Sequence, residues 1–275
     1  MNSGTVHLGF SPTGLLPWVA ISLPYLVATR HGGFGTTRRE RGLLALGCLL
    51  GALATSWPLA TAAHQDFLWA MVAERLVLLL AVPPLLLAGT SRALAGRLTR
   101  ARLVDRFVLV LARPVVAIFS VTVLLAATVL PGVVAMAVHH AVVATLVDVA
   151  VVVAGLILWL PTSERFPGVP TLSAGGQCGY LIVQGVAPTF LSVVWIFARH
   201  PLYPALGASS RKLMDPVLDQ RLAGFIAKFA TLAVLFAVAF VVLVRADPDE
   251  DLRRQELRDD DLARVVERAR RRPHA

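Results

Sequence analysis

Ionisable side chains interrupt three apolar stretches of this sequence, where a charged group is costly to bury. They are Glu74 with its neighbour Arg75, Asp148, and Lys228. In a membrane such groups face one another or a polar cavity, and they commonly mark a functional site. A salt bridge that only holds helices together is the alternative, and the residues alone leave both open. We predict that Glu74, Asp148 and Lys228 form one intramembrane polar network.

Four of the seven histidines adjoin apolar stretches, on what we expect to be the same side of a membrane. They are His64, His139, His140 and His200. Imidazoles from separate loops can bind a transition metal, and copper also accepts thioether sulfur, which Met71 and Met136 would provide. The spacing matches no known metal motif, and histidines at a membrane interface need bind nothing. These four histidines are therefore a candidate copper site.

The apolar content of the chain indicates which elements position these residues. Of 275 residues 56% are hydrophobic and 16% charged, with a mean hydropathy of +0.70, more than a soluble core needs. Seven apolar stretches cover residues 15–28, 43–59, 67–88, 108–134, 141–160, 179–198 and 223–244. Because about 20 apolar residues cross a bilayer as a helix, we predict an all-α integral membrane bundle of seven transmembrane helices. A soluble globular enzyme is excluded.

Arginine-rich loops predict how the bundle is oriented. The segments 28–42 and 92–106 and the tail after Val244 are rich in arginine, whereas 60–66 and 131–140 contain no Lys or Arg. Only the loop 199–221 fits less well, with four basic residues on the other side. The positive-inside rule then places the N-terminus outside and the C-terminus in the cytoplasm. We expect a transmembrane domain over residues 1–244 and a charged cytoplasmic tail, amphipathic or disordered, over 245–275.

The net charge of +9 does not indicate nucleic-acid binding, because the basic residues lie mainly in loops that flank the membrane. The zinc-protease pattern H-E-x-x-H, the nucleotide-binding P-loop and the G-x-S-x-G pattern are absent from the sequence. Only two of the 26 basic residues are lysine, which is typical of a GC-rich bacterial genome. We expect a multi-pass protein of a bacterial plasma membrane that is not an enzyme.

Two pairs of segments resemble the CtaG-type family of bacterial cytochrome c oxidase assembly proteins. His-Pro-Leu-Tyr-Pro at 200–204 and Asp-Gln-Arg-Leu-Ala-Gly at 219–224 are similar to the family's P-L-Y and D-Q-x-x-A-G motifs. Trp-Pro-Leu at 57–59 and Pro-Pro-Leu-Leu-Leu-Ala-Gly at 83–89 resemble its S-P-L and P-P-L-L-x-L-G signatures. The likeness covers most of residues 38–244.

The start of the third apolar stretch departs from the family pattern. The family usually carries His-Met-x-x-His there, with two imidazoles on one helix face. In this sequence the two positions fall on Ala70 and Glu74, or, with a shift of one residue, on Met71 and Arg75. Neither histidine is present, so a metal or haem role for that pair is not implied.

The resemblance implies a seven-helix membrane protein that assists assembly of cytochrome c oxidase, with oxidase subunits or other assembly factors as partners. The resemblance implies a role in copper-centre maturation at the outer face of the membrane. A small-solute or metal transporter, or a divergent paralogue serving as a structural partner of a respiratory complex, remains the alternative. We expect Asp219 to cap the last helix, and Pro83 and Pro84 to kink the third helix and free carbonyls for neighbouring helices.

Overall fold

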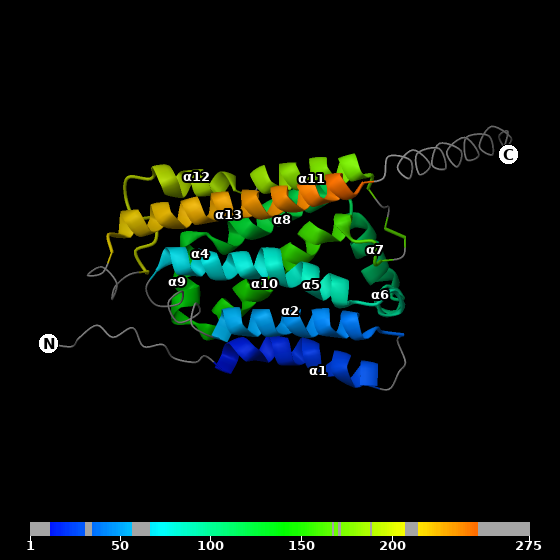
Figure 1. Cartoon of the computed structure of the whole chain (residues 1–275). Helices are drawn as coiled ribbons and strands as arrows, with labels where there is room; N and C mark the ends of the chain where they lie inside the picture. Colours follow the sequence, from blue (N-terminus) through cyan, green and yellow to red (C-terminus); the bar gives the residue numbers. More distant parts are fainter. Residues whose placement is uncertain are drawn as a thin grey trace, which may run out of the picture.

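The computed structural model describes residues 12–30, 35–56, 67–166, 168–169, 172–187, 189–206 and 214–246. These residues form helices that run side by side in one bundle (Figure 1), which confirms the all-α prediction. The helices are α1 (Leu16–Arg30), α2 (Arg38–Ser56), α4 (Leu68–Leu76), η2 (Val77–Ala81), α5 (Val82–Gly89), α6 (Arg92–Leu98), α7 (Arg102–Leu111), α8 (Pro114–Thr128), α9 (Pro131–His139), α10 (Ala141–Trp159), α11 (Ala174–Val186), α12 (Phe190–Phe197) and α13 (Pro216–Arg245).

Within the described ranges, four helical segments are long and apolar enough to cross a membrane, which indicates a multi-pass membrane protein. They are Leu68–Gly89, Ala141–Thr162, Ala174–Phe197 and Pro216–Arg245. A fifth is added if α7 and α8, which are bent by 92°, count as one span. The first two stretches that the sequence predicts as spans are not among the four. They form α1, of 15 residues with Pro24 inside, and α2, which begins with charged residues.

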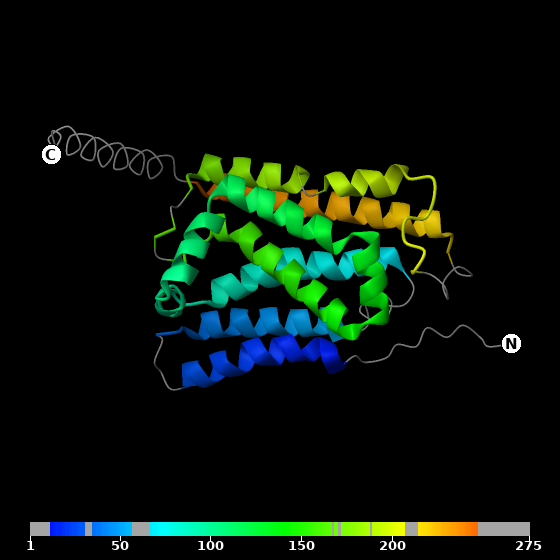
Figure 2. The same cartoon turned by 180° about the vertical axis from the view of Figure 1, so that it is seen from behind.

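The fourth predicted stretch, 108–134, is not one helix. The structure divides it among α7, α8 and α9, and Pro114 and Pro131 stand at the first position of α8 and α9. Proline lacks the amide hydrogen that a helix interior needs, whereas its fixed φ suits a helix start. The prediction of one helix was therefore wrong, because hydropathy alone does not show that these prolines separate three helices. Seen from behind in Figure 2, α10 crosses the bundle diagonally, in contact with α8 and α5.

The span Leu68–Gly89 contains a π-helical segment, η2, directly before Pro83 and Pro84. The carbonyl of Leu79 would accept from the amide four or five residues later, but both positions are proline. The indole Nε1 of Trp159 on α10 donates to this carbonyl instead, at 3.3 Å. The expectation that a neighbouring helix satisfies a carbonyl freed by the prolines is thus confirmed.

Gly155 lets α10 approach this bend closely, and we expect Gly155→Ala to lower the free energy of unfolding by about 1–3 kcal/mol. The added Cβ would lie 2.4 Å from Cγ of Pro83 and 2.6 Å from the carbonyl oxygen of Leu79, and neither atom belongs to a flexible side chain. Thermal unfolding of the protein in detergent measures the loss. Gly179→Ala is the matched control, because a Cβ there meets nothing within 4 Å. Equal melting temperatures for the two variants would contradict the packing argument.

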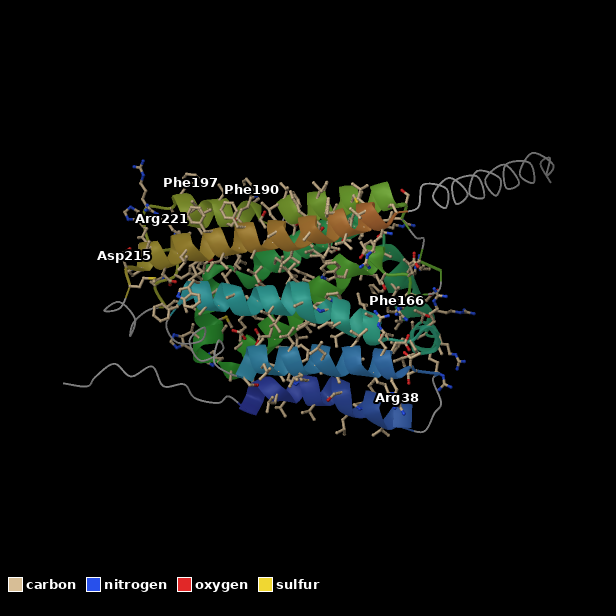
Figure 3. The ribbon with its side chains drawn as sticks, viewed as in Figure 1. Arg38, Phe166, Phe190, Phe197, Asp215 and Arg221 are labelled. Atoms are coloured by element: carbon tan, nitrogen blue, oxygen red, sulfur yellow. The ribbon has the colours of Figure 1, made fainter. Side chains whose placement is uncertain are left out.

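The two ends of the bundle differ in the residues they carry. Figure 3 shows Arg38 and Phe166 at one end, and Phe197, Asp215 and Arg221 at the other. At the Arg38 end, Arg165 and Glu40 form an ion pair with 2.7 Å between Nη1 and Oε1. Helices α6 and α7 lie at this same end (Figure 1), and α13 finishes there. At the other end α4, α12 and α13 are joined by the hydrogen bonds described next.

Candidate functional site

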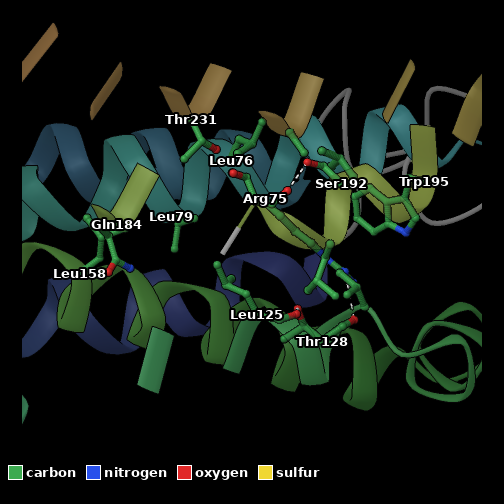
Figure 4. A pocket seen from close by; sticks show the side chains of 15 residues that line it. Arg75, Leu76, Leu79, Leu125, Thr128, Leu158, Gln184, Ser192, Trp195 and Thr231 are labelled. Atoms are coloured by element: carbon green, nitrogen blue, oxygen red, sulfur yellow. Dashed lines mark hydrogen bonds between the residues drawn. The ribbon is translucent and has the colours of Figure 1, made fainter. Parts of the chain in front are cut away.

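A cavity of about 90 Å³ lies between α4, α8, α10, α11, α12 and α13 (Figure 4). Aliphatic side chains make up most of its wall, with Trp195 at one side. A few polar side chains interrupt this wall: Arg75, Thr128, Gln184, Thr189, Ser192 and Thr231. An apolar cavity with a few convergent polar groups is the usual form of a small-ligand site. The residues that line the cavity come from six helices, so the complete fold is needed to assemble the site.

Arg75 is the cationic side chain that lines this cavity. It is seven residues into α4, about 10 Å along the helix axis at roughly 1.5 Å per residue. Its Nη1 donates to the carbonyl of Thr128 at the end of α8, at 3.1 Å. Guanidinium has five N–H donors, and this is its single hydrogen bond to the described residues. The carboxylates of Asp148 and Glu74 stabilise its charge through space, without a direct ion pair.

Glu74 lies on the same helix and is almost fully buried, with 1% of its surface exposed. Its Oε1 has no hydrogen-bond partner among the described residues, and its nearest charges are those of Asp148 and Arg75. Lys228, the third member of the predicted network, donates from Nζ to Oγ1 of Thr189 at 3.0 Å. The structure therefore groups Glu74 and Asp148 around Arg75, and it places Lys228 at the break between α11 and α12.

Gln184 on α11 is a site residue that the sequence reasoning missed. Its exposed fraction is 0%, and neither its Nε2 nor its Oε1 has a partner in the described part of the chain. Buried amides without protein partners are normally hydrogen-bonded to water or to a ligand. At roughly 30 Å³ for each water, the cavity has room for about three. The sequence feature that could have identified it is a glutamine inside the apolar stretch 179–198.

The span Ala174–Phe197 is interrupted beside this cavity, between α11 and α12. Thr189 lies in the interruption, where its hydroxyl contacts the carbonyls of Gly185 and Val186 at 2.9 and 3.0 Å. Ser192 donates its hydroxyl to the carbonyl of Thr189. Because these side chains satisfy carbonyls near the break, the interruption can persist inside a membrane. This interrupted span and the span Leu68–Gly89, which carries the π-helical segment η2, thus border the same cavity.

Asp219 acts as a helix cap, but of a different helix from the one expected. Its carboxylate accepts from the amides of Leu68 and Trp69, at 2.8 and 3.1 Å, at the start of α4. The cap of its own helix, α13, is Asp215, which accepts from the amides of Val217 and Leu218. Because α4 and α13 begin side by side, a carboxylate in the first turn of α13 can reach the free amides of α4.

The two motifs near the C-terminus form one hydrogen-bonded group. Gln220 accepts from the amide of Leu202 at 2.8 Å and donates to the carbonyl of Trp195 at 3.3 Å. The hydroxyl of Tyr203 accepts from the indole of Trp195 and donates to the carbonyl of Val129 at 2.7 Å. Burial raises the pKa of Tyr203, so this donor stays protonated at neutral pH. The group ties α12 and α13 to the end of α8 beside the cavity, which Trp195 and Val129 both line.

The structure does not assemble the predicted copper site from the residues it describes. His139 and His140 are exposed where α9 meets α10, and His200 is exposed after α12. His64 lies outside the described residues. Among the residues placed by the structure, no three His, Cys, Asp or Glu side chains come together as a metal ion would require. The four-histidine site stays a prediction.

A comparison with known families covers nearly all of this architecture. The family model described as cytochrome c oxidase caa3 assembly factor (Caa3_CtaG) matches residues 23–246. The matched range contains every residue that lines the cavity and both C-terminal motifs. No curated protein and no solved structure matches the chain.

Proposed function

Because the chain belongs to the cytochrome c oxidase caa3 assembly factor family, we propose that it is a membrane accessory protein in the assembly of a cytochrome c oxidase. The match over residues 23–246 is the observation that carries this proposal. The family description implies a protein that helps to build another complex, and we assign this chain no reaction of its own. Its partners are then oxidase subunits or further assembly factors, met within the bilayer.

The proposed topology has seven spans, with α1 and α2 as the first two and with the N-terminus outside. This is supported by the arginines, because Arg38 lies at the bundle end that also carries α6, α7 and the end of α13 (Figures 1 and 3). Arginine favours the cytoplasmic side of a membrane. The transmembrane domain then covers 1–244, the tail 245–275 is cytoplasmic, and the cavity opens in the outer half of a bacterial plasma membrane.

Within this topology we propose that the assembly role depends on the outer half of the bundle. The cavity that Arg75 and Gln184 line lies there, and so do the exposed His139, His140 and His200. Copper-centre maturation at this face, with His64 added, is the proposed task. The proposed polar network holds Glu74, Asp148 and Lys228 as its charged members.

The proposal is tested in membranes from a strain that lacks the gene and from its complemented control. We expect deletion to remove the reduced-minus-oxidised absorbance of haem a together with oxidase activity, and the gene to restore both. Partial restoration by added copper would support the copper route. An unchanged spectrum and unchanged activity would contradict the assembly role and favour a paralogue with a structural task.

A second candidate function, transport of a small solute or metal, is favoured by one observation. The span Ala174–Phe197 is interrupted beside the cavity, and the span Leu68–Gly89 carries a π-helical segment there. Interrupted helices around a central site are typical of secondary transporters. The deletion strain separates the candidates, because a copper transporter should alter the copper content of the cells, whereas an assembly factor should alter the oxidase alone.

A further inference from the structure

Helix α7 differs from the other long helices in its direction. It meets α8 at 92°, and in Figure 1 it runs across the end of the bundle. If α8 crosses the bilayer, a helix at a right angle to it lies in the plane of the membrane. The link between them is short, from Leu111 to Pro114, so α7 is held at the depth where α8 enters.

One face of α7 is apolar and uncovered. None of its residues is buried, and the side chains of Leu103 and Phe107 are 73% and 66% exposed. These two residues are four apart and therefore share a face, which Val104 and Val110 extend. Exposing such an apolar face to water is unfavourable and promotes association, and no described residue of the chain covers it.

The flanks of this face are strongly basic. Residues 92–113 contain six arginines and one acidic residue, Asp105, which is a net charge of 6 − 1 = +5. Arg102 and Arg106 are exposed and lie one turn apart, and no ion pair in the described ranges involves them. Guanidinium groups bind phosphate through paired hydrogen bonds. Basic residues beside an apolar helix face are typical of helices at an anionic lipid surface.

We propose that α7 is an anionic-lipid binding site, with Leu103 and Phe107 among the acyl chains and Arg102 and Arg106 on lipid phosphates. The occupant is the cytoplasmic leaflet, because the charge, the apolar face and the in-plane direction all match it. This inference uses the proposed orientation of the bundle but not the role in oxidase assembly. The site holds the α6–α7 end of the bundle at a fixed depth.

Nitroxide labels test the depth of the helix in vesicles. The variants Leu103→Cys, Phe107→Cys and Arg106→Cys are made singly in protein that also carries Cys48→Ala and Cys178→Ser. Each is labelled and reconstituted in vesicles of phosphatidylcholine mixed with phosphatidylglycerol. We expect the labels at 103 and 107 to collide more with oxygen and the label at 106 more with a water-soluble nickel chelate. A label at Phe119, which is 70% exposed on α8, gives the reference for a deep position. Water-accessible labels at all three α7 positions would overturn the proposal.

The role of the arginines is tested by adding phosphatidylglycerol to purified protein in detergent. Native mass spectrometry measures how much lipid is bound at each concentration. Arg102→Gln with Arg106→Gln should weaken binding about fivefold for each arginine removed. Arg38→Gln with Arg39→Gln, two exposed arginines at the same end, is the matched control and should bind as the unchanged protein does. Equal losses in both double variants would mean a diffuse charge effect and would overturn a site on α7. In the labelling experiment, labels at 103 and 107 that become inaccessible to the water-soluble nickel chelate only when oxidase is added would also overturn the proposal, in favour of a protein partner.

Discussion

Replacing Asp219 with alanine is expected to lower the free energy of unfolding by about 2–4 kcal/mol. Its carboxylate accepts two backbone hydrogen bonds, at 2.8 and 3.1 Å, from the first amides of α4, and its exposed fraction is only 8%. Hydrogen bonds to a charged group contribute about 1.5–3 kcal/mol each, and the carboxylate interacts favourably with the positive end of the helix dipole, but the cost of burying its charge offsets part of this gain. Unfolding of the protein in detergent, followed by circular dichroism, measures the loss.

Asp215→Ala is the control for this prediction, since Asp215 is also an N-cap but is more exposed and caps α13 alone. Its expected cost is about 1 kcal/mol. An Asp219→Ala variant that is no less stable than Asp215→Ala would show that the contact between α13 and α4 contributes little. Asp219→Asn should fall between the two, because an amide oxygen can still accept but carries no charge.

The second large effect is expected at Arg75. Arg75→Leu removes a hydrogen bond from a charged group to the carbonyl of Thr128, which contributes about 1.5–3 kcal/mol, together with the through-space attraction of Asp148 and Glu74. We expect Arg75→Leu to be strongly destabilised and to be partly rescued by adding Asp148→Asn and Glu74→Gln. Lys228→Met should cost about 1.5 kcal/mol, because it loses one hydrogen bond from a charged group to Thr189 and no second interaction. Unfolding in detergent compares all of these variants.

The rescue pattern decides which cation organises the network. A network centred on Arg75 requires that the carboxylate variants rescue Arg75→Leu and not Lys228→Met. The reverse pattern would restore the network that the sequence predicts, with Lys228 as the partner.

Gln184→Leu adds a separate readout, since an apolar residue of similar size removes two unpartnered polar atoms and should not destabilise the protein. If this variant folds but fails to restore the oxidase, the amide serves a ligand.

The sequence predicted the positions of the polar groups better than their partners. The depth of Glu74, Asp148 and Lys228 follows from counting residues along each helix. Their partners depend on how each helix is rotated about its axis, which counting along one chain does not give. Arg75 was therefore left outside the predicted network although it lies within the charged group. Asp219 shows the same limit, because its capped amides are about 150 residues away in the chain.

The elements themselves were predicted where local chemistry decides them. Pro83 and Pro84 must free carbonyls wherever they occur in a helix, and the structure shows Trp159 at one of them. The stretch 108–134 was wrong as a single helix, because apolar content outweighed Pro114 and Pro131 in the interpretation. The first two predicted spans form helices in the structure that are too short (α1) or too charged at the start (α2) to count as membrane spans by length and composition.

The π-helical segment η2 also acts as a phase shift within one span. One extra residue in a turn rotates everything after it by about 100° relative to an unbroken α-helix. The half before η2 packs on α13 and directs Arg75 into the cavity, whereas the half after it packs on α2 and α10. One helix thus presents two independent faces to two sets of neighbours. A relative without this extra residue would align one position out of step on one side of η2.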